Sequence, residues 1–419
     1  MVPGLVGAQR GADNCDPENA GLRLPQGFCA IVYAERVGVD GDTLKNPRHM
    51  VIAPNGDVIV SAQGRGGVGG VWILRDENGD GKADKAVHFA RGFIASEVAL
   101  FDGYLYTETT TSILRFPFPN GTFAPADKPD TVAEDLPGGG SHPFKTFTID
   151  RAGNLYVNFG TATNSCQASD RQKESAGHQP CEEVEIRGGI WKFDSRKLHQ
   201  KPSPENHFAR GIRNAVGIAM SPMDGKLWTT RHGRDGLGGE KEGAGQWPES
   251  VHYNAENPAE ELLQVNKGDD FGWPYCYYSV DEHHLVLAPE YGGDSKKVGQ
   301  CAQKKEPVAV FPAHWAPNGL MFYTGSMFPA KYKNGAFIAF HGSWNRAPEQ
   351  QQGDNVVFQP LNGGKAAGAF EVFAEGFSGF NPRASWSHRP TGLAQGIDGS
   401  LFVADDAGGR IYKIVYAKK

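Results

Sequence analysis

A pattern of strand, glycine-containing turn and strand recurs six times, and it constrains the fold more than any other feature of the sequence. The copies are residues 51–60, 98–106, 147–157, 218–228, 320–340 and 393–403, of which the fifth is lengthened by an insertion. Most copies place Asn-Gly or Asp-Gly at the turn, where a tight hairpin needs a positive φ. A further apolar strand follows several copies, at 70–74, 112–116, 189–193 and 409–414. Each copy is therefore predicted to form a small antiparallel sheet.

Six such sheets favour an all-β fold, a six-bladed β-propeller, because radial closure leaves no long exposed edge. A β-sandwich is the alternative, but it gives no reason for six similar turns. The strand at 28–33 is predicted to pair with residues 411–415 and close the ring. We expect residues 27–419 to be one propeller domain after an N-terminal extension, 1–26. Long insertions in blades four and five, within 229–317, are expected to build a site.

The amino-acid composition excludes some classes of function. The chain has 42 Lys and Arg against 48 Asp and Glu, a formal net charge of −6, and no basic run, which argues against nucleic acid as a partner. No stretch is apolar enough for a membrane span. The first ten residues are too short and too polar for a signal peptide, so we expect that an export signal has been removed.

The six cysteines fall into three pairs that are close in sequence, and none forms a CxxC motif. We interpret Cys15 with Cys29, Cys166 with Cys181, and Cys276 with Cys301 as three local disulfides. Six separate buried thiols are the alternative. Disulfides would place the protein in an oxidising compartment, either the periplasm or the cell exterior.

The residues just before each repeat should meet at one end of the propeller axis, which we call the mouth. They are rich in His, Arg, Lys and Asn: Arg48 and His49, Ser96 and Glu97, His142 and Lys145, Arg213 and Asn214, Pro317 and Asn318, and His388 and Arg389. Each one alone could be a solvated loop residue, but their recurrence at equivalent positions indicates a site. The ring predicts a cationic mouth suited to a polyanionic small molecule, since Arg binds carboxylates in bidentate fashion.

Several segments resemble the glucose/sorbosone dehydrogenases, which are soluble quinoproteins. They are HPFK at 142–145, FARGIRN at 208–214, HGRD at 232–235, GWPYC at 272–276, IAFHGSWNR at 338–346 and RPTG at 389–392. The resemblance extends from about Leu24 to the end of the chain and is greatest to the sorbosone and pyranose dehydrogenase branch. It implies a six-bladed propeller that holds pyrroloquinoline quinone (PQQ) and Ca²⁺ at one end of the axis.

The same resemblance assigns roles. His142 matches the catalytic base, which takes the hydroxyl proton of the sugar while hydride moves to the quinone. Arg213 and Asn214 match the pair that contacts the quinone oxygens, where Arg213 would also stabilise developing charge. Other cofactor contacts are expected from Arg389, His341, Trp344, Lys145 and Arg48. The backbone carbonyls of Gly233 and Arg234 match the calcium-binding turn.

A second calcium hint lies in residues 76–84, where Asp76, Asn78, Asp80 and Asp84 space oxygen ligands around a Gly turn. The loop departs from an EF-hand because Val87 stands where the bidentate Glu is expected. A hairpin turn that is merely rich in Asp is the equal alternative.

The sequence thus predicts a PQQ- and calcium-dependent dehydrogenase of an aldose, a pyranose or a sorbosone-like sugar aldehyde. No CxxCH haem motif occurs, so electrons would pass to an external acceptor, a cytochrome or a quinone. Two alternatives stay open. A calcium-dependent propeller lactonase would use acidic and amide residues such as Glu97 and Asn318 around an axial metal. A non-catalytic binding propeller would give no functional reason for His142, Arg213 and Arg389.

Overall fold

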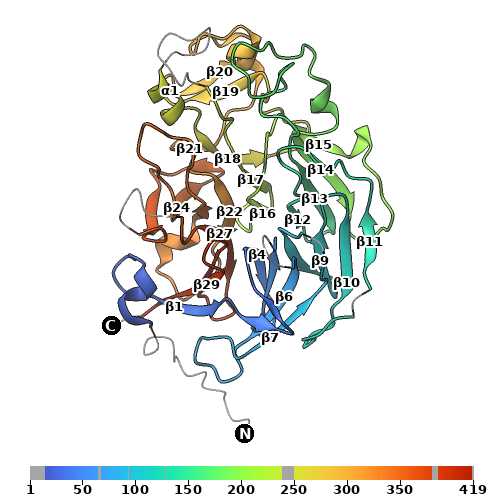
Figure 1. Ribbon diagram of the computed structural model, residues 1–419, viewed down its shortest axis with the longest axis vertical. Helices are drawn as coiled ribbons and strands as arrows, with labels where there is room; N and C mark the ends of the chain where they lie inside the picture. The colour runs from blue at the N-terminus through green and yellow to red at the C-terminus, as the bar shows by residue number, and fades with distance from the viewer. Residues whose placement is uncertain are drawn as a thin grey trace.

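The computed structural model describes residues 15–64, 68–92, 94–126, 128–237, 250–379 and 386–417. Six sheets surround a central axis (Figure 1), which confirms the predicted six-bladed propeller. In each sheet the first strand of the repeat lies innermost and runs away from the mouth, and the second returns toward it. Every predicted repeat forms the hairpin of the first two strands of a blade.

The first three blades are sheets of four consecutive strands. Blade 1 contains β4 (Pro47–Ile52), β5 (Val58–Ala62), β6 (Gly70–Arg75) and β7 (Lys85–Phe89). Blade 2 contains β8 (Val98–Phe101), β9 (Tyr104–Glu108), β10 (Ile113–Pro117) and β11 (Asp130–Ala133). Blade 3 contains β12 (Phe147–Ile149), β13 (Asn154–Phe159), β14 (Gly189–Asp194) and β15 (His207–Arg210).

The other three blades are less regular. Blade 4 contains β16 (Ile218–Met220), β17 (Leu227–Arg231), β18 (Glu260–Val265) and β21 (Ala309–Phe311). Blade 5 contains β22 (Pro317–Phe322), β23 (Gly335–Phe340), β24 (Asn355–Asn362), β25 (Lys365–Ala366) and β26 (Glu371–Ala374). Blade 6 contains β27 (Pro390–Gln395), β28 (Leu401–Asp405), β29 (Arg410–Tyr416) and β1 (Phe28–Glu35).

Short elements decorate the blades. Two small hairpins are formed by β2 (Gly38–Val39) with β3 (Asp42–Thr43), and by β19 (Cys276–Ser279) with β20 (His284–Leu287). One α-helix is described, α1 (Val251–Glu256), and six 3₁₀ segments are η1 (Pro17–Gly21), η2 (Glu182–Glu185), η3 (Pro204–Asn206), η4 (Pro289–Tyr291), η5 (Gly299–Gln303) and η6 (Ala330–Lys333). In the described ranges no helix is long and apolar enough to cross a bilayer.

Strand β1 pairs antiparallel with β29 from Phe28 opposite Tyr416 to Glu35 opposite Arg410, with one bulge. The ring therefore closes as predicted, with an N-terminal strand on the outer edge of the last blade. Residues 15–26 are tied to this strand through the Cys15–Cys29 disulfide and a hydrogen bond from the Val32 amide to Asp16 Oδ2 (2.6 Å). The predicted division between an extension, 1–26, and a propeller domain, 27–419, stays a prediction.

The core lies between blades, because each sheet must bury both faces. Six buried apolar clusters occupy the six junctions between neighbouring blades. At the closing junction, for example, Tyr33 and Phe402 of blade 6 pack with Val58 and Trp72 of blade 1. Rigid junctions of this kind hold the strand ends at the mouth in fixed positions.

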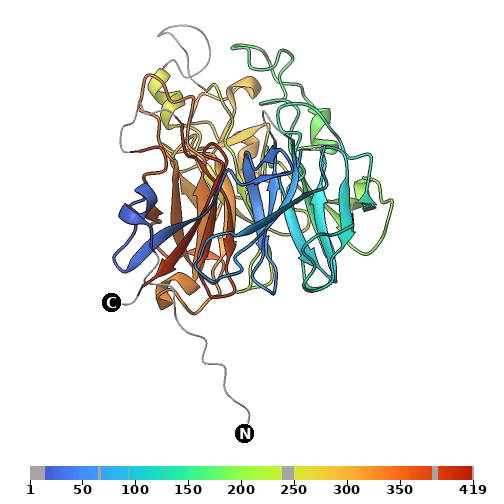
Figure 2. The same cartoon turned by 60° about the horizontal axis from the view of Figure 1, so that its bottom comes forward.

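The loops at the mouth end are long (Figure 2). Blade 4 carries the whole predicted insertion, in two parts, 232–259 and 266–308, while blade 5 carries 341–354. An insertion that the sequence did not reveal, 160–188, belongs to blade 3. All three predicted disulfides are present, and Cys166–Cys181 and Cys276–Cys301 each close a loop within these insertions.

Candidate active site at the mouth of the propeller

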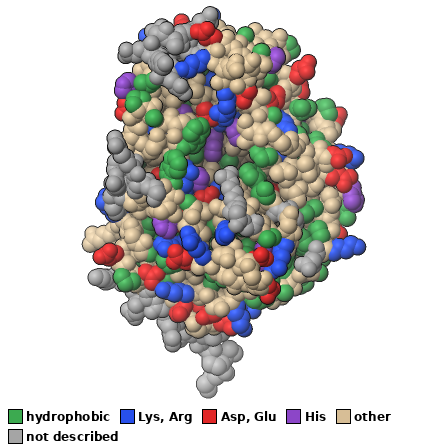
Figure 3. All heavy atoms as spheres, in the orientation of Figure 1, with side chains coloured by type: hydrophobic (Ala, Val, Ile, Leu, Met, Phe, Trp, Pro, Cys, Tyr) green, Lys and Arg blue, Asp and Glu red, His purple; other side chains and the backbone are tan. Residues whose placement is uncertain are grey.

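The mouth is a depression in which histidine, lysine and arginine side chains gather (Figure 3). Two kinds of position supply them. The starts of the first strands provide Arg48 and Arg389, and the ends of the second strands provide His232 and His341. These positions meet because the strands are antiparallel: in blade 5, for instance, Pro317 at the start of β22 pairs with Phe340 at the end of β23. The ring predicted from the sequence is thus assembled from both.

Arg48 and His341 share one carboxylate, although they come from blades 1 and 5. Asp406, directly after β28, accepts a hydrogen bond from Arg48 Nη1 (2.8 Å) on Oδ2, and its Oδ1 lies 2.8 Å from His341 Nε2. Burial opposes ionisation of Asp406, but His341 and Arg48 outweigh it and hold the pKa of this carboxyl well below its usual range. Asp406 is therefore a fixed negative charge that joins three blades.

Two backbone carbonyls hold the guanidinium of Arg389. Its Nε donates to the carbonyl of His341 (2.7 Å) and its Nη2 to the carbonyl of Gly342 (2.5 Å). Asp354 lies 3.7 Å away and is mostly buried. Burial raises the pKa of Asp354 to about 7, against the opposing effect of Arg389. Near neutral pH this carboxyl is therefore partly protonated.

The raised pKa of Asp354 predicts a pH-dependent stability. Folding favours the protonated form, so the free energy of unfolding should fall as pH rises from about 4 to about 7 and then level off. Asp354→Asn removes the ionisation, and the variant should gain stability relative to the wild type across that window. Urea unfolding of both proteins between pH 4 and pH 8 measures the difference, and a difference that does not change with pH would contradict the assignment.

Arg213 lies in a buried network with an insertion loop of each neighbouring blade. Its Nη2 donates to Asn164 Oδ1 (3.0 Å) and Asp235 Oδ2 (3.0 Å), and its Nη1 donates to the carbonyl of Gly233 (2.8 Å). Burial opposes ionisation of Asp235, but Arg213 and Arg171 outweigh it and lower the pKa to about 2. Arg48, Arg389 and Arg213 therefore each have an aspartate neighbour, which the prediction of a cationic mouth did not include.

His142 lies beside Arg213 at the start of blade 3, and its proton position can be deduced. Its Nδ1 is 2.9 Å from the carbonyl of Thr161 and 3.0 Å from the hydroxyl of the same residue. A carbonyl only accepts, so Nδ1 carries the hydrogen and the lone pair is on Nε2. Burial, together with Arg213 and His232, lowers the pKa of His142 well below its usual value. The imidazole is neutral, as a general base must be.

The turn after β17 contains His232, Gly233 and Arg234. Burial and the neighbouring Arg213 lower the pKa of His232 to about 3, so this imidazole is neutral as well. The side chain of Arg234 is buried against Glu290. The carbonyl of Gly233 accepts from Arg213 and retains a second lone pair, so the oxygen donors of this turn are of the hard type that suits Ca²⁺.

Asn214 and Lys145 take different positions. Asn214 Oδ1 accepts from Asn158 Nδ2 (3.3 Å) next to Arg213. Lys145 is completely buried, and its Nζ donates to the carbonyl of Pro143 (2.5 Å). Burial lowers the pKa of Lys145 to about 7, and the nearby carboxyl is Glu108, whose pKa burial raises to about 8. Its predicted cofactor contact stays a prediction, and it would require this ammonium to leave its buried position.

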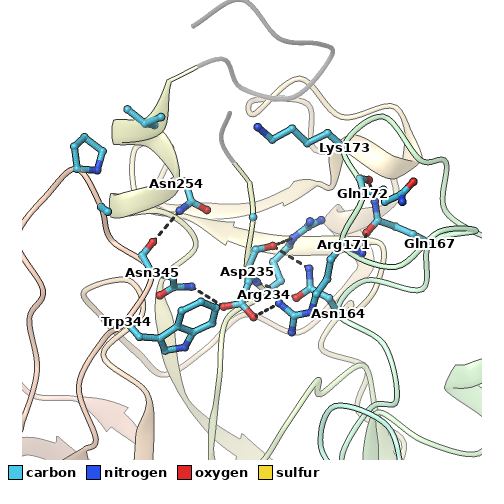
Figure 4. Close-up of a pocket in the computed structure, with 14 residues that line it drawn as sticks. Asn164, Gln167, Arg171, Gln172, Lys173, Arg234, Asp235, Asn254, Trp344 and Asn345 are labelled. Carbon is cyan, nitrogen blue, oxygen red and sulfur yellow. Dashed lines mark hydrogen bonds and ion pairs between the residues drawn. The ribbon is translucent and has the colours of Figure 1, made fainter. Parts of the chain in front are cut away.

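Trp344 lies at the edge of a cavity of about 690 Å³ built by the insertions of blades 3, 4 and 5 (Figure 4). Its indole is 60% exposed, unlike most aromatic rings here. Asp235 forms part of the same wall, where it accepts from Asn345 Nδ2 (2.7 Å) and from Arg171 Nη1 (3.0 Å). Through Asp235 the cavity is joined to Arg213, and its size suits a sugar substrate.

The predicted second calcium loop lies elsewhere. Asp76, Asn78, Asp80 and Asp84 are in the turn between β6 and β7, at the end of blade 1 away from the mouth. Their side chains cap the loop itself: Asp76 accepts from the amides of Gly79 (2.7 Å) and Gly81 (2.8 Å). Within the described chain, no three His, Cys, Asp or Glu side chains form a metal-binding group. Calcium binding in this loop stays a prediction.

The axial residues considered for a lactonase are already paired. Glu97 Oε2 lies 2.6 Å from His49 Nδ1, and His49 Nε2 donates to the carbonyl of Asn318 (2.7 Å). Both groups face the central channel below the mouth, in a cavity of about 220 Å³. This arrangement ties the axial carboxylate to an imidazole, which favours a structural role for the pair.

Sequence reasoning missed Thr161, Asn164, Asp235 and Asp406. All four orient predicted site residues, and two follow a second strand closely. The available signal was position: a polar residue just after the second strand of a blade faces the same mouth as the residue before the first.

Comparison with known proteins decides the family. A family model described as TrAA12-like matches residues 33–417, nearly the whole propeller. The chain belongs to the TrAA12-like family. This membership confirms the predicted kinship with PQQ-dependent sugar dehydrogenases and the predicted class of oxidoreductase.

Relatives in this group carry consistent names. A PQQ-dependent sugar dehydrogenase of Hypocrea jecorina is 24% identical over 366 residues, which cover 79% of this chain and 77% of the relative. A PQQ-dependent pyranose dehydrogenase of Coprinopsis cinerea is 28% identical over 54% of this chain, and the match spans only 34% of that enzyme. An uncharacterised Borreliella burgdorferi protein is 28% identical, and the match spans about half of each chain, 53% and 52%.

Solved structures agree on the fold. The Trichoderma reesei carbohydrate-active enzyme of family AA12 superposes with a TM-score of 0.75 at 20% identity, covering 94% of this chain and 98% of the other. The holo PQQ domain of the Coprinopsis cinerea pyranose dehydrogenase gives 0.74 at 20% identity, covering 94% and 97%. Both comparisons support a six-bladed propeller for this chain.

Proposed function

We propose that the protein is a PQQ- and calcium-dependent dehydrogenase that oxidises a pyranose, an aldose or a sorbosone-like sugar aldehyde. The observation that carries the proposal is His142, a neutral imidazole whose Nε2 lone pair is available next to the buried cation of Arg213. Family membership and the names of the relatives support the same activity.

The mouth fits an anionic quinone. Arg48 Nε is buried and has no hydrogen-bond partner among the described residues, so this guanidinium retains an unused donor. The Arg389 guanidinium lies 3.7 Å from Asp354, and Arg213 and Asn214 are neighbours in the connection before blade 4. We assign cofactor contacts to Arg48, Arg213, Asn214, His341, Trp344 and Arg389. The carbonyls of Gly233 and Arg234 would bind Ca²⁺.

When bound, PQQ supplies the acceptor for the hydride of the sugar carbon. The residues of this chain do the rest. His142 Nε2 takes the hydroxyl proton, while the Thr161 carbonyl holds Nδ1–H and fixes the ring orientation. Arg213 is positioned by Asn164 and Asp235, so its charge stabilises negative charge that develops beside it.

Electrons are proposed to leave to an external acceptor, a cytochrome or a quinone, because the chain contains no haem motif. We also propose a periplasmic or secreted location. The three disulfides support it, since such bonds persist in oxidising compartments.

The test is a titration of the metal-free apoprotein with PQQ, with and without Ca²⁺, followed by absorbance. A panel of aldoses, pyranoses and sugar ketoaldehydes is then added with an electron-accepting dye. We expect saturable calcium-dependent binding and sugar-dependent dye reduction. A folded protein that binds calcium but not PQQ would overturn the proposal, and lactone hydrolysis by that protein would establish the lactonase alternative.

A further inference from the structure

A second imidazole at the mouth is held in a way that differs from His142. His341 follows β23, and its Nε2 lies 2.8 Å from Asp406 Oδ1. The other oxygen of Asp406 accepts from Arg48 Nη1 (2.8 Å), and the Asp406 carbonyl accepts from Asn46 Nδ2 (3.0 Å). Arg48 therefore holds the carboxylate, and Asn46 holds the backbone that carries it, before the carboxylate orients His341.

The proton of His341 can be located from this contact. Asp406 is ionised, because the two positive or proton-donating neighbours hold its pKa well below the usual range. An ionised carboxylate only accepts, so His341 Nε2 carries the hydrogen and the lone pair is on Nδ1. The side chain is 18% exposed at the mouth, and Nδ1 is not among the buried unpartnered atoms of the described residues. This nitrogen is thus open to the mouth.

The charged and titratable groups facing His341 are known. Arg48 and Arg389 interact with the ring electrostatically, Asp406 binds Nε2, and His232 is close enough to interact as well. Burial lowers the pKa of His341, while Asp406 opposes that shift. The result is a neutral ring at neutral pH whose protonated form Asp406 would stabilise. His142 lacks this support, since its anchor is the neutral Thr161.

We propose that His341, oriented by Asp406, is a second acid–base group, which accepts a proton from the reduced cofactor while electrons pass to the acceptor. This inference rests on the proposed function. Oxidation of a sugar CH–OH to C=O delivers a hydride to the cofactor and a proton to His142. The hydride carries two electrons and one proton, so reoxidation releases two electrons and that one proton, while His142 returns the hydroxyl proton to solvent. With a one-electron acceptor such as a ferric complex, the proton left on the reduced cofactor must go to the protein, and His341 Nδ1 takes it and passes it to solvent.

The first experiment needs no cofactor. Two-dimensional ¹H–¹⁵N NMR of the histidine rings in the full-length apoprotein, assigned with His341→Gln, should show His341 with hydrogen on Nε2. Asp406→Asn should lower the apparent pKa of that ring, because the carboxylate no longer stabilises the imidazolium. Hydrogen on Nδ1 in the wild type would overturn the inference whether or not the protein binds PQQ.

The second experiment separates the two half-reactions by stopped flow in the PQQ-loaded enzyme. His341→Gln and Asp406→Asn should slow reoxidation by ferricyanide by about a hundredfold or more, at the low end of what proton-transfer groups contribute. An acceptor that takes up protons with its electrons, such as dichlorophenolindophenol, should be affected much less. His142→Gln should instead slow reduction by sugar. The exposed His199→Gln is the matched control.

Equal losses in both half-reactions with both acceptors, together with weaker PQQ binding in the absorbance titration, would reduce His341 to a cofactor contact and overturn the inference. Absence of PQQ binding in the wild type would instead refute the proposed function. The two failures are therefore distinguishable.

Discussion

His142→Ala is expected to abolish sugar oxidation while leaving PQQ affinity close to that of the wild type. The imidazole is oriented by the Thr161 carbonyl and kept neutral by burial and Arg213, so its loss removes the group assigned to take the hydroxyl proton beside Arg213. Loss of a general base typically costs about 10²–10⁴-fold in rate. The measurement is steady-state kcat with an artificial acceptor, alongside the absorbance titration with PQQ.

His199→Ala is the matched control for that variant, because this exposed histidine pairs with Glu134 on the outside of blades 2 and 3. Unchanged kcat in His142→Ala would exclude the assigned role. Loss of PQQ binding together with activity would show that the ring holds the cofactor instead of serving as the base.

Arg231→Met is expected to produce the largest loss of stability among single substitutions near the mouth. Arg231 ends β17, and its Nη1 donates to the carbonyls of Gly211 (3.0 Å) and Phe271 (2.6 Å) while its Nη2 pairs with Glu261. Both side chains are almost inaccessible, at 5% and 2%. Removing one partner of a buried pair typically costs about 3–5 kcal/mol. Urea unfolding followed by tryptophan fluorescence measures the change.

Two further variants serve as comparisons for Arg231→Met. Lys85→Met breaks the exposed pair with Glu77 and should cost at most about 1 kcal/mol. The double replacement Arg231→Met/Glu261→Leu should recover part of the loss, because no buried charge is left alone. A single variant as stable as Lys85→Met would mean that the Arg231–Glu261 pair is not buried in solution.

The blades could be predicted because their signal is local. Asp102 and Gly103, for example, both adopt positive φ at the β8–β9 turn. An Asp-Gly sequence between two apolar strands predicts such a turn. Closure by β1 was also predictable, since Ile411 to Val415 would otherwise form an open edge. The cysteine pairing followed from proximity in sequence alone.

The site was less predictable because it depends on contacts between blades. Nothing in the local sequence reveals that Asp406 would reach Arg48, which is 358 residues away, or that Asp235 would join Arg213 to Asn345. Lys145 is a residue that the sequence pattern placed in the ring although its ammonium is buried. Its spacing from His142 placed it in the ring, but only packing determines that its ammonium is buried near Glu108. The resemblance identified which residues to examine, and the structure supplied their partners.

The pairing of β1 with β29 also sets an order of events in synthesis. Blade 6 cannot be completed until residues 410–416 exist, so five blades and three strands must wait for the last part of the chain before the ring can close. Contacts between sequence-distant segments are slow to form and leave strand edges exposed meanwhile. Until β29 forms, β28 of the unfinished blade 6 therefore presents an unpaired edge that can pair with another chain.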